Sequence, residues 1–299
     1  KTRINIQKVL DTHALACYHT TIPNRTQVQI YFVEEEANKM KKFVALLLAV
    51  LMVASLCACG QKGTGSDLQT VTKGKLIMST NAEFAPYEYV ADDGKGFQGT
   101  GYEGIDIEIA YALAQKLGLE LVVDNMDFDA ALSAVQTGKS DMVAAGVTVT
   151  PDRLNAMSFT DSYANGVQVV IVKEGSDIKS IDDLQGKKIG TQRGTTGFLY
   201  CSDDFGDDNV IGFDDGATAV QNLKAGKIDC VVIDNVPAQE YVKANPGLTI
   251  LDTEYANEDY AIGIAKDNTA LQEALNKALA ELKADGTIQS IIDKYIPAK

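Results

Sequence analysis

Histidine and tryptophan are the clearest omissions from this 299-residue sequence, which contains two histidines and no tryptophan. Both histidines, His13 and His19, precede Cys59, which we identify below as the first residue of the mature protein. A mature chain without histidine has no histidine general base, no Ser-His or Cys-His nucleophile pair and no histidine metal site. We therefore expect no catalytic residues, no metal and no cofactor, and a protein that is not an enzyme.

Cysteine is also sparse, and its spacing excludes two further classes of site. The five cysteines are Cys17, Cys57, Cys59, Cys201 and Cys230, and no two of them form a Cys-x-x-Cys pair. Zinc ribbons and thioredoxin-like redox sites need that spacing, so both are excluded. We expect Cys201 on a helix and Cys230 on a strand, and the sequence leaves open whether these two form a disulfide.

Positive charge is in deficit, with 27 Lys and Arg against 41 Asp and Glu and a net charge of -14. Nucleic acid is therefore not an expected partner, because binding to phosphates needs a basic surface. The hydrophobic content of 45% and charged content of 23% are ordinary for a globular protein. The length suits one large domain or two ordinary ones.

A short apolar segment near the N-terminus has the pattern of a secretory signal. Two lysines follow Met40, and an uncharged run from residue 43 to residue 56 leads to Cys57-Ala58-Cys59-Gly60. This run is shorter than the about 20 residues that a membrane span needs. A basic start followed by a short apolar run is typical of a signal peptide, and the ending resembles a bacterial lipobox with a lipid on Cys59. The alternative is a plain signal peptide with an incidental cysteine.

This pattern divides the N-terminal part into three segments. We expect residues 1–39 to lie upstream of the natural start, residues 40–58 to form a lipoprotein signal peptide, and residues 59–67 to be a flexible tether. The expected location is extracytoplasmic, on a bacterial cell membrane, through a lipid anchor on Cys59.

An internal repeat predicts the architecture of the remaining chain. Residues 131–146 read ALSAVQTGKSDMVAAG and residues 219–234 read AVQNLKAGKIDCVVID. Both run from a helix through Gly-Lys-x-Asp into an apolar strand, with Gly138 and Gly226 placed to end the helices. The alternating pattern predicts two equivalent α/β lobes with parallel sheets covered by helices on both faces. The predicted strands are 75–80, 119–123, 141–145, 167–172, 187–191, 228–233 and 260–265, and the predicted helices are 105–117, 129–137, 195–201, 216–225, 236–244, 269–284 and 286–295.

Ligands of such folds bind beyond the carboxyl ends of the strands, and two loops at these ends in the first half of the chain carry suitable residues. The loop at residues 81–89 begins with Asn81 and contains Phe84, an aromatic that either walls a ligand pocket or plugs the domain edge. The loop at residues 145–153 runs from Ala145 to Arg153. Its Thr150 suits a helix N-cap and its Pro151 the first helical position. An arginine in the first helical turn opposes the helix dipole, which indicates a fork for a carboxylate, or else a surface salt bridge.

The second half of the chain contributes two more loops. Gln192 begins a glycine-rich turn that continues through Thr195 and Thr196, where backbone N–H groups are suited to a small anion. Asp234 directly follows the apolar strand of the second repeat. It either pairs with an ammonium group or caps the helix that follows. Arg153 and Asp234 together would clamp a zwitterion.

Several motifs in order resemble one known family. They are FAPYEY (84–89), GIDIEIAYALA (104–114), DMVAAGVTVTPDR (141–153), GTTG (194–197), GKIDCVVID (226–234) and ADGTIQSIIDKY (284–295). Over about residues 68 to 299 the chain resembles the polar amino-acid-binding proteins of ABC importers, the family 3 extracellular solute-binding proteins. The resemblance implies a periplasmic-binding-protein-like II fold, in which two Rossmann-like lobes are joined by a two-strand hinge. It implies lobe 1 at residues 68–164 plus 258–299 and lobe 2 at residues 165–257.

The resemblance also implies roles for individual residues. Arg153 would hold the α-carboxylate of a free amino acid, helped by Thr148 and the backbone at Thr196. Asp234 would hold the α-ammonium with Thr148 and the Gly146 carbonyl. The remaining implied contacts are Phe84 and Phe128 on either side of the ligand side chain and Asn81 at its polar end.

The implied function is capture of a polar L-amino acid, cationic ones included, by a monomer that delivers it to an ABC permease in the membrane. Many relatives that bind cationic side chains have aspartate at the position of Asn81, whereas Glu83 and Asp127 keep the expected entrance acidic. The main alternative is a dehydratase-type enzyme on the same fold, which would need a general acid that the sequence does not identify. The other is an amino-acid sensor domain, which would need a membrane span and a signalling domain.

The lipobox generates the first prediction. Cys59→Ala should release the protein into the medium or leave it unprocessed, because the thiol that carries the lipid is gone. Membrane fractionation followed by mass determination of the N-terminus measures both outcomes. A variant that is processed and yet stays on the membrane would rule out Cys59 as the anchor.

Overall fold

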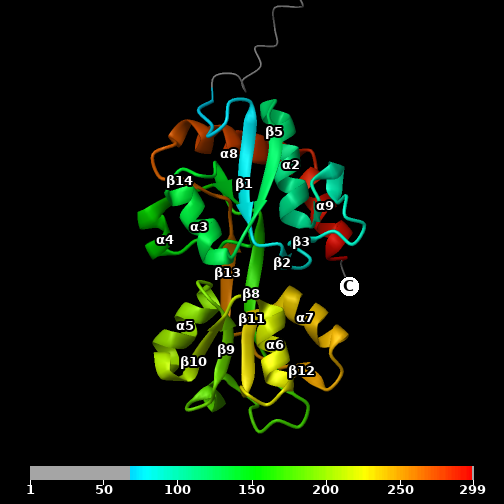
Figure 1. The fold of residues 1–299 in the computed structure, drawn as a ribbon, viewed down its shortest axis with the longest axis vertical. Helices are drawn as coiled ribbons and strands as arrows, with labels where there is room; N and C mark the ends of the chain where they lie inside the picture. The colour runs from blue at the N-terminus through cyan, green and yellow to red at the C-terminus, as the bar shows by residue number, and fades with distance from the viewer. Residues whose placement is uncertain (1–67, 298–299) are drawn as a thin grey trace, which may run out of the picture. The chain divides into compact units, whose positions relative to one another are not determined.

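The computed structural model describes residues 68–297, which form two large β-sheets with helices on their faces and one small antiparallel sheet (Figure 1). The segments predicted at 1–39, 40–58 and 59–67 fall before these residues, so the signal peptide, the tether and Cys59 lie outside the described part. Within residues 68–297, no helix is long and apolar enough to cross a membrane.

The first sheet has the strand order β5-β1-β6-β14-β7. Its strands are β1 (Lys75–Thr80), β5 (Glu120–Asn125), β6 (Met142–Val143), β7 (Met157–Phe159) and β14 (Gly263–Ala265). One face packs on α2 (Ile105–Leu117), α8 (Thr269–Ala284) and α9 (Thr287–Tyr295), and the other on α3 (Phe128–Gln136). The short helix α4 (Pro151–Ala156) precedes β7, and a small antiparallel sheet of β2 (Glu83–Phe84), β3 (Glu88–Val90) and β4 (Tyr102–Glu103) precedes α2. We call the part built on this sheet the first lobe.

The second sheet has the strand order β10-β9-β11-β8-β12, and β13 pairs with β8. Its strands are β8 (Ala164–Lys173), β9 (Ile189–Gln192), β10 (Val210–Phe213), β11 (Cys230–Asp234), β12 (Leu248–Ile250) and β13 (Ala256–Tyr260). Helices α6 (Gly216–Lys224) and α7 (Asn235–Ala244) cover one face, and α5 (Thr196–Phe205) covers the other. We call the part built on this sheet the second lobe.

Burial on both faces explains why the central strands of the second sheet read as continuous apolar runs. In β8, Val169 and Ile171 pack into the cluster under α6 and α7, whereas Val170 and Val172 pack into the opposite cluster with α5. Successive side chains of a strand point to opposite faces, so a strand covered on both sides needs an apolar residue at every position. Cys201 on α5 and Cys230 on β11 lie in the latter cluster as free, buried thiols, on a helix and a strand as predicted.

The prediction of parallel sheets with helices on both faces is correct for most central strands and wrong for two of them. Strands β5, β1 and β6 are parallel, as are β10, β9 and β11, but β14 runs antiparallel to β6, and β8 runs antiparallel to β11. Both exceptions follow from the path of the chain, since β8 and the segment containing β13 and β14 cross between the sheets and meet the parallel strands from the opposite direction. The strand predicted at 260–265 is accordingly divided between β13 and β14.

The repeated Gly-Lys-x-Asp motif has the same structural task in both lobes. In the first lobe, Asp141 accepts hydrogen bonds from the backbone N–H groups of Val71 and Ile77, each at 2.7 Å. In the second lobe, Asp229 accepts one from the Lys188 N–H at 2.8 Å. Each aspartate precedes one strand and accepts backbone N–H groups that lie in or just before the neighbouring parallel strand. The two strands therefore run side by side, and their carboxyl ends lie at the same edge of the sheet.

Two antiparallel segments connect the lobes. The pairing of β8 with β13 places Asn165 opposite Asp259 and Gly166 opposite Glu258. The Asn165 side chain also donates a hydrogen bond of 2.6 Å to Asp259. The chain thus passes between the two sheets as a paired ribbon next to the cavity described below.

Candidate functional site

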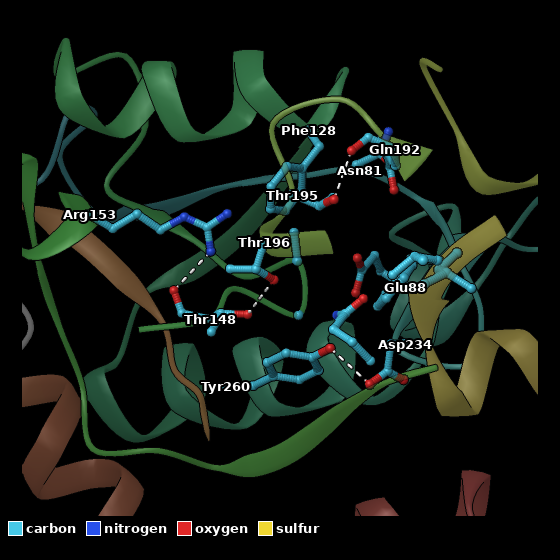
Figure 2. Close-up of a pocket in the computed structure, with 16 residues that line it drawn as sticks. Asn81, Glu88, Phe128, Thr148, Arg153, Gln192, Thr195, Thr196, Asp234 and Tyr260 are labelled. Carbon is cyan, nitrogen blue, oxygen red and sulfur yellow. Dashed lines mark hydrogen bonds between the residues drawn. The ribbon is translucent and has the colours of Figure 1, made fainter. Parts of the chain in front are cut away.

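A cavity with about 450 Å³ of empty space, part of it open to solvent, lies where the strand ends of both sheets meet. Side chains from both lobes point into it (Figure 2). Every residue that the sequence predicted to bind ligand lines this cavity: Asn81, Phe84, Phe128, Ala145, Gly146, Thr148, Arg153, Gln192, Thr195, Thr196 and Asp234. The residues that line it and were not predicted are Glu88, Gln168, Val232, Ile233 and Tyr260.

Arg153 enters the cavity from α4. Thr150 caps this helix by accepting the Arg153 N–H at 3.2 Å, and Pro151 occupies the first position, as the sequence predicted. The guanidinium is buried, with the residue 7% exposed. It donates to the Thr148 carbonyl at 2.8 Å and, across to the second lobe, to the Gly194 carbonyl at 3.1 Å.

The Arg153 guanidinium has no carboxylate within ion-pair distance among residues 68–297, so the surface salt bridge considered from the sequence is not formed. Its centre lies 5.4 Å from the centroid of the Phe128 ring, within the range of a cation–π contact. Burial lowers the pKa of Arg153, and the nearby Glu258 carboxylate opposes this shift. Since arginine stays protonated in proteins, the cavity holds a buried cation whose partners are neutral.

Asp234 lies at the carboxyl end of β11 and caps the helix that follows, which is one of the two interpretations made from the sequence. It caps α7 by accepting the Val236 N–H at 2.9 Å, and it also lines the cavity. Its other oxygen accepts from the Val167 N–H at 2.9 Å and from the Tyr260 hydroxyl at 3.0 Å. Burial raises the pKa of Asp234 to about 6.

A pair of neutral amides spans the lobes at another side of the cavity. Gln192 donates to the Asn81 side-chain oxygen at 2.8 Å and to the Asp214 carbonyl at 3.1 Å. Asn81 in turn donates to the Met126 carbonyl at 3.0 Å. Both amides are buried, so this wall of the cavity is polar and uncharged.

Gly146 shows why the loop after β6 needs glycine. Its φ of 53° lies in the left-handed region, and a Cβ there would come within 3.0 Å of the Phe84 ring. Its N–H donates to Asp106 at 2.8 Å. Two residues on, the Thr148 hydroxyl lies 3.4 Å from that of Thr196 in the second lobe.

The unpredicted residues were missed for two reasons. Glu88 lies inside the FAPYEY motif, where the sequence drew attention to the aromatics, and a charged residue between two tyrosines is a weak signal by itself. Gln168 and Tyr260 lie in β8 and β13 and fall within the predicted strands 167–172 and 260–265, whereas the sequence placed the ligand contacts in loops at strand ends. Gln168 donates to Glu258 at 2.9 Å, a contact that joins these two strands.

The cavity is suited to a zwitterion of amino-acid size. Figure 2 shows Arg153 entering from one side, with Asp234 and Glu88 on the other. No group of His, Cys, Asp and Glu side chains in the described part is arranged to hold a metal ion. The cavity thus combines a cation, acids and neutral amides around a partly apolar space.

Comparisons with known proteins agree with this chemistry. The family model described as bacterial extracellular solute-binding proteins, family 3, matches residues 76–298. The arginine-binding extracellular protein ArtP of Bacillus subtilis (strain 168) is 33% identical over 266 residues, covering 86% of this chain and 98% of that protein.

Solved structures are similar over the same region. An ancestral arginine-binding protein bound to arginine is 41% identical with a TM-score of 0.69, and the match covers 75% of this chain and 99% of that one. An ancestral arginine-binding protein bound to glutamine is 40% identical with a TM-score of 0.70, covering 76% and 100%.

Proposed function

The chain belongs to the bacterial extracellular solute-binding proteins, family 3, and we propose that it captures a polar amino acid outside the cytoplasm and delivers it to an ABC importer, held to the membrane by a lipid on Cys59. Relatives in this family are amino-acid-binding proteins of ABC transporters, and the fold is the type II periplasmic-binding fold that the sequence predicted. The anchor is supported by the lipobox alone, since Cys59 precedes the described residues.

The arrangement of Arg153 and Asp234 is the observation that carries this proposal. A buried guanidinium without an anionic partner is costly, because desolvation is not repaid by an ion pair. A ligand carboxylate would supply that partner through charge-assisted hydrogen bonds. Asp234 on the other side of the cavity would receive the α-ammonium, so one amino acid would satisfy both buried charges.

Acidic residues near the cavity favour a ligand side chain that is cationic or otherwise polar. Burial raises the pKa of Glu83, and the carboxylates of Asp215, Asp127 and Asp214 raise it further. Such a set attracts cations, whereas the Asn81–Gln192 amide pair offers neutral polar contacts. We therefore propose arginine as the first candidate, in line with the names of the relatives, and glutamine as the second.

The direct test is calorimetry of the mature protein against the common L-amino acids. We expect arginine or another polar amino acid to bind, and Arg153→Ala to weaken binding by about 30-fold or more, because loss of one partner of a buried charged pair typically costs about 2–5 kcal/mol. Lys75→Ala is the control, since Lys75 has an exposed side chain and pairs with Glu120 at the amino ends of β1 and β5, away from the cavity. An unchanged dissociation constant for Arg153→Ala would remove Arg153 from the site.

Binding should also weaken in acid. Because burial raises the pKa of Asp234 to about 6, its carboxylate is ionised at pH 7.5 and mostly protonated at pH 5. The protonated form loses its attraction for the α-ammonium, so affinity should fall by about tenfold between these pH values. Calorimetry at both pH values measures this. Asp234→Asn should bind weakly at either pH, and a steep pH dependence in that variant would assign the effect to another group.

The positions of the clamp residues further imply that ligand binding closes the two lobes. Arg153 belongs to the first lobe and Asp234 to the second. In the described structure the lobes already touch through the Arg153–Gly194 and Asn81–Gln192 hydrogen bonds and through Tyr241, which donates to the Glu83 carbonyl at 3.2 Å. We propose a hinge where β8 pairs with β13, with lobe 1 at residues 68–164 plus 258–299 and lobe 2 at residues 165–257.

Small-angle scattering tests this closure. We expect the radius of gyration to fall on saturation with ligand, because a ligand held by both lobes prefers the closed form. An analogue that lacks the α-ammonium group should largely lose the effect. Identical radii with and without ligand, with binding verified by calorimetry, would mean that the pocket is rigid.

A further inference from the structure

Two buried acids lie next to each other behind one wall of the cavity. Glu88 on β3 and Asp106 in the first turn of α2 are each 1% exposed. The Asp106 N–H donates to the carbonyl of Tyr87, the residue before Glu88, at 2.9 Å. Neither oxygen of Glu88 and only one oxygen of Asp106 has a hydrogen-bond partner within residues 68–297.

No basic side chain among residues 68–297 forms an ion pair with either acid. Two ionised carboxylates in contact and out of water repel each other strongly, so such a pair retains one proton between its oxygens. Burial and the Asp106 charge raise the pKa of Glu88 well above its usual range, whereas the pKa of Asp106 is raised by burial to about 6. Asp106 accepts the Gly146 N–H, which favours its ionised form, whereas Glu88 accepts no hydrogen bond from residues 68–297, so Glu88 is the partner that keeps the proton.

The surrounding titratable groups leave this assignment unchanged. Tyr163, which precedes β8, and Tyr87, which precedes β3, face the pair, and burial together with the Asp106 and Glu88 charges raises the pKa of both phenols. Asp234 from the second lobe also raises the pKa of Tyr87. Tyr260 and Glu258 on β13 and Arg153 on α4 lie farther along the cavity, around Asp234. The neighbours nearest the pair are thus neutral phenols or acids.

Asp106 connects the pair to the cavity through Gly146. Its second oxygen accepts the Gly146 N–H at 2.8 Å. Gly146 lines the cavity in a left-handed conformation, so its backbone depends on this contact for its orientation. Glu88 itself lines the cavity, on the same side as Asp234 and opposite Arg153 (Figure 2).

We propose that Glu88 is a positioning residue of the pocket: it keeps a proton at neutral pH, donates it in a hydrogen bond to Asp106, and thereby holds the Asp106 carboxylate against the Gly146 N–H. The pair then carries a single negative charge behind the ammonium end of the cavity. This role rests on the proposed function, because the Gly146 loop matters as part of an amino-acid pocket. The proton on Glu88, however, is a property of the protein without ligand.

Infrared spectroscopy of the ligand-free protein tests the proton directly. At neutral pH we expect a carbonyl stretch of a protonated carboxyl group, at higher frequency than the amide band. Glu88→Gln should remove this band, because glutamine keeps the shape and the hydrogen-bond donor but not the acid. The matched control Glu273→Gln changes an exposed glutamate on α8 and should leave the band in place. Absence of the band in the wild type, or its persistence in Glu88→Gln, would overturn the proposal.

Calorimetry with the amino acid that binds the wild type tests the positioning role. Glu88→Gln should bind within about threefold of the wild type, because its amide can still donate to Asp106, whereas Glu88→Ala should bind about tenfold or more weakly. A loss of 30-fold or more in Glu88→Gln would show that Glu88 is an ionised counter-ion instead. Wild-type affinity in Glu88→Ala would show that it positions nothing.

The two measurements separate this proposal from the proposed function. If no amino acid binds the wild type, the function is wrong, and the infrared band still decides whether Glu88 holds a proton. If Glu88→Ala does not fold, Glu88→Gln and the infrared band decide between a protonated acid and a counter-ion.

Discussion

Burial of the Arg153 guanidinium against one backbone carbonyl from each lobe is the constraint on which the site depends. The contacts with the Thr148 and Gly194 carbonyls satisfy donors but do not neutralise the charge. Desolvating an unpaired cation costs free energy that the remaining fold must offset. The N-cap at Thr150 and the ring of Phe128 fix the side chain in that position. Such a cost is the expected compromise between stability and function if, as proposed above, the guanidinium receives an anionic ligand.

The opposite end of the cavity contains several acids, whose burial costs free energy unless each is protonated or hydrogen-bonded. Asp234, Glu88 and Asp106 are all buried, and burial raises the pKa of each. These acids differ in the hydrogen-bond donors that surround them. Asp234 receives three hydrogen bonds from backbone and phenol donors, whereas Asp106 receives one and Glu88 receives none within residues 68–297. The first arrangement favours an ionised carboxylate that is ready for an ammonium group, and the second favours a retained proton.

The internal repeat explains how distant parts of the chain reach one cavity. In each lobe an aspartate of the Gly-Lys-x-Asp turn holds the N–H groups of a neighbouring segment, which sets two parallel strands side by side. The loops after β1, β6, β9 and β11 then come together where the lobes meet. The antiparallel ribbon of β8 and β13 links the lobes and contributes Tyr260 and Gln168 to the wall.

Local sequence patterns determined the positions of many helices and several residues of the cavity. Periodicity and glycine placement predicted α2 and α8 to the residue. The strand-end positions of Asp234 and Asn81 and the place of Arg153 in a first helical turn predicted residues that the structure brings to one cavity. These features depend on neighbours in the chain, which a sequence displays. Only the tertiary structure decided that β8 and β14 run against the parallel strands, that Gln192 pairs with Asn81, and that Glu88 meets Asp106. Those contacts join segments far apart in the chain, and their energies depend on burial and distance, which the order of residues alone does not contain.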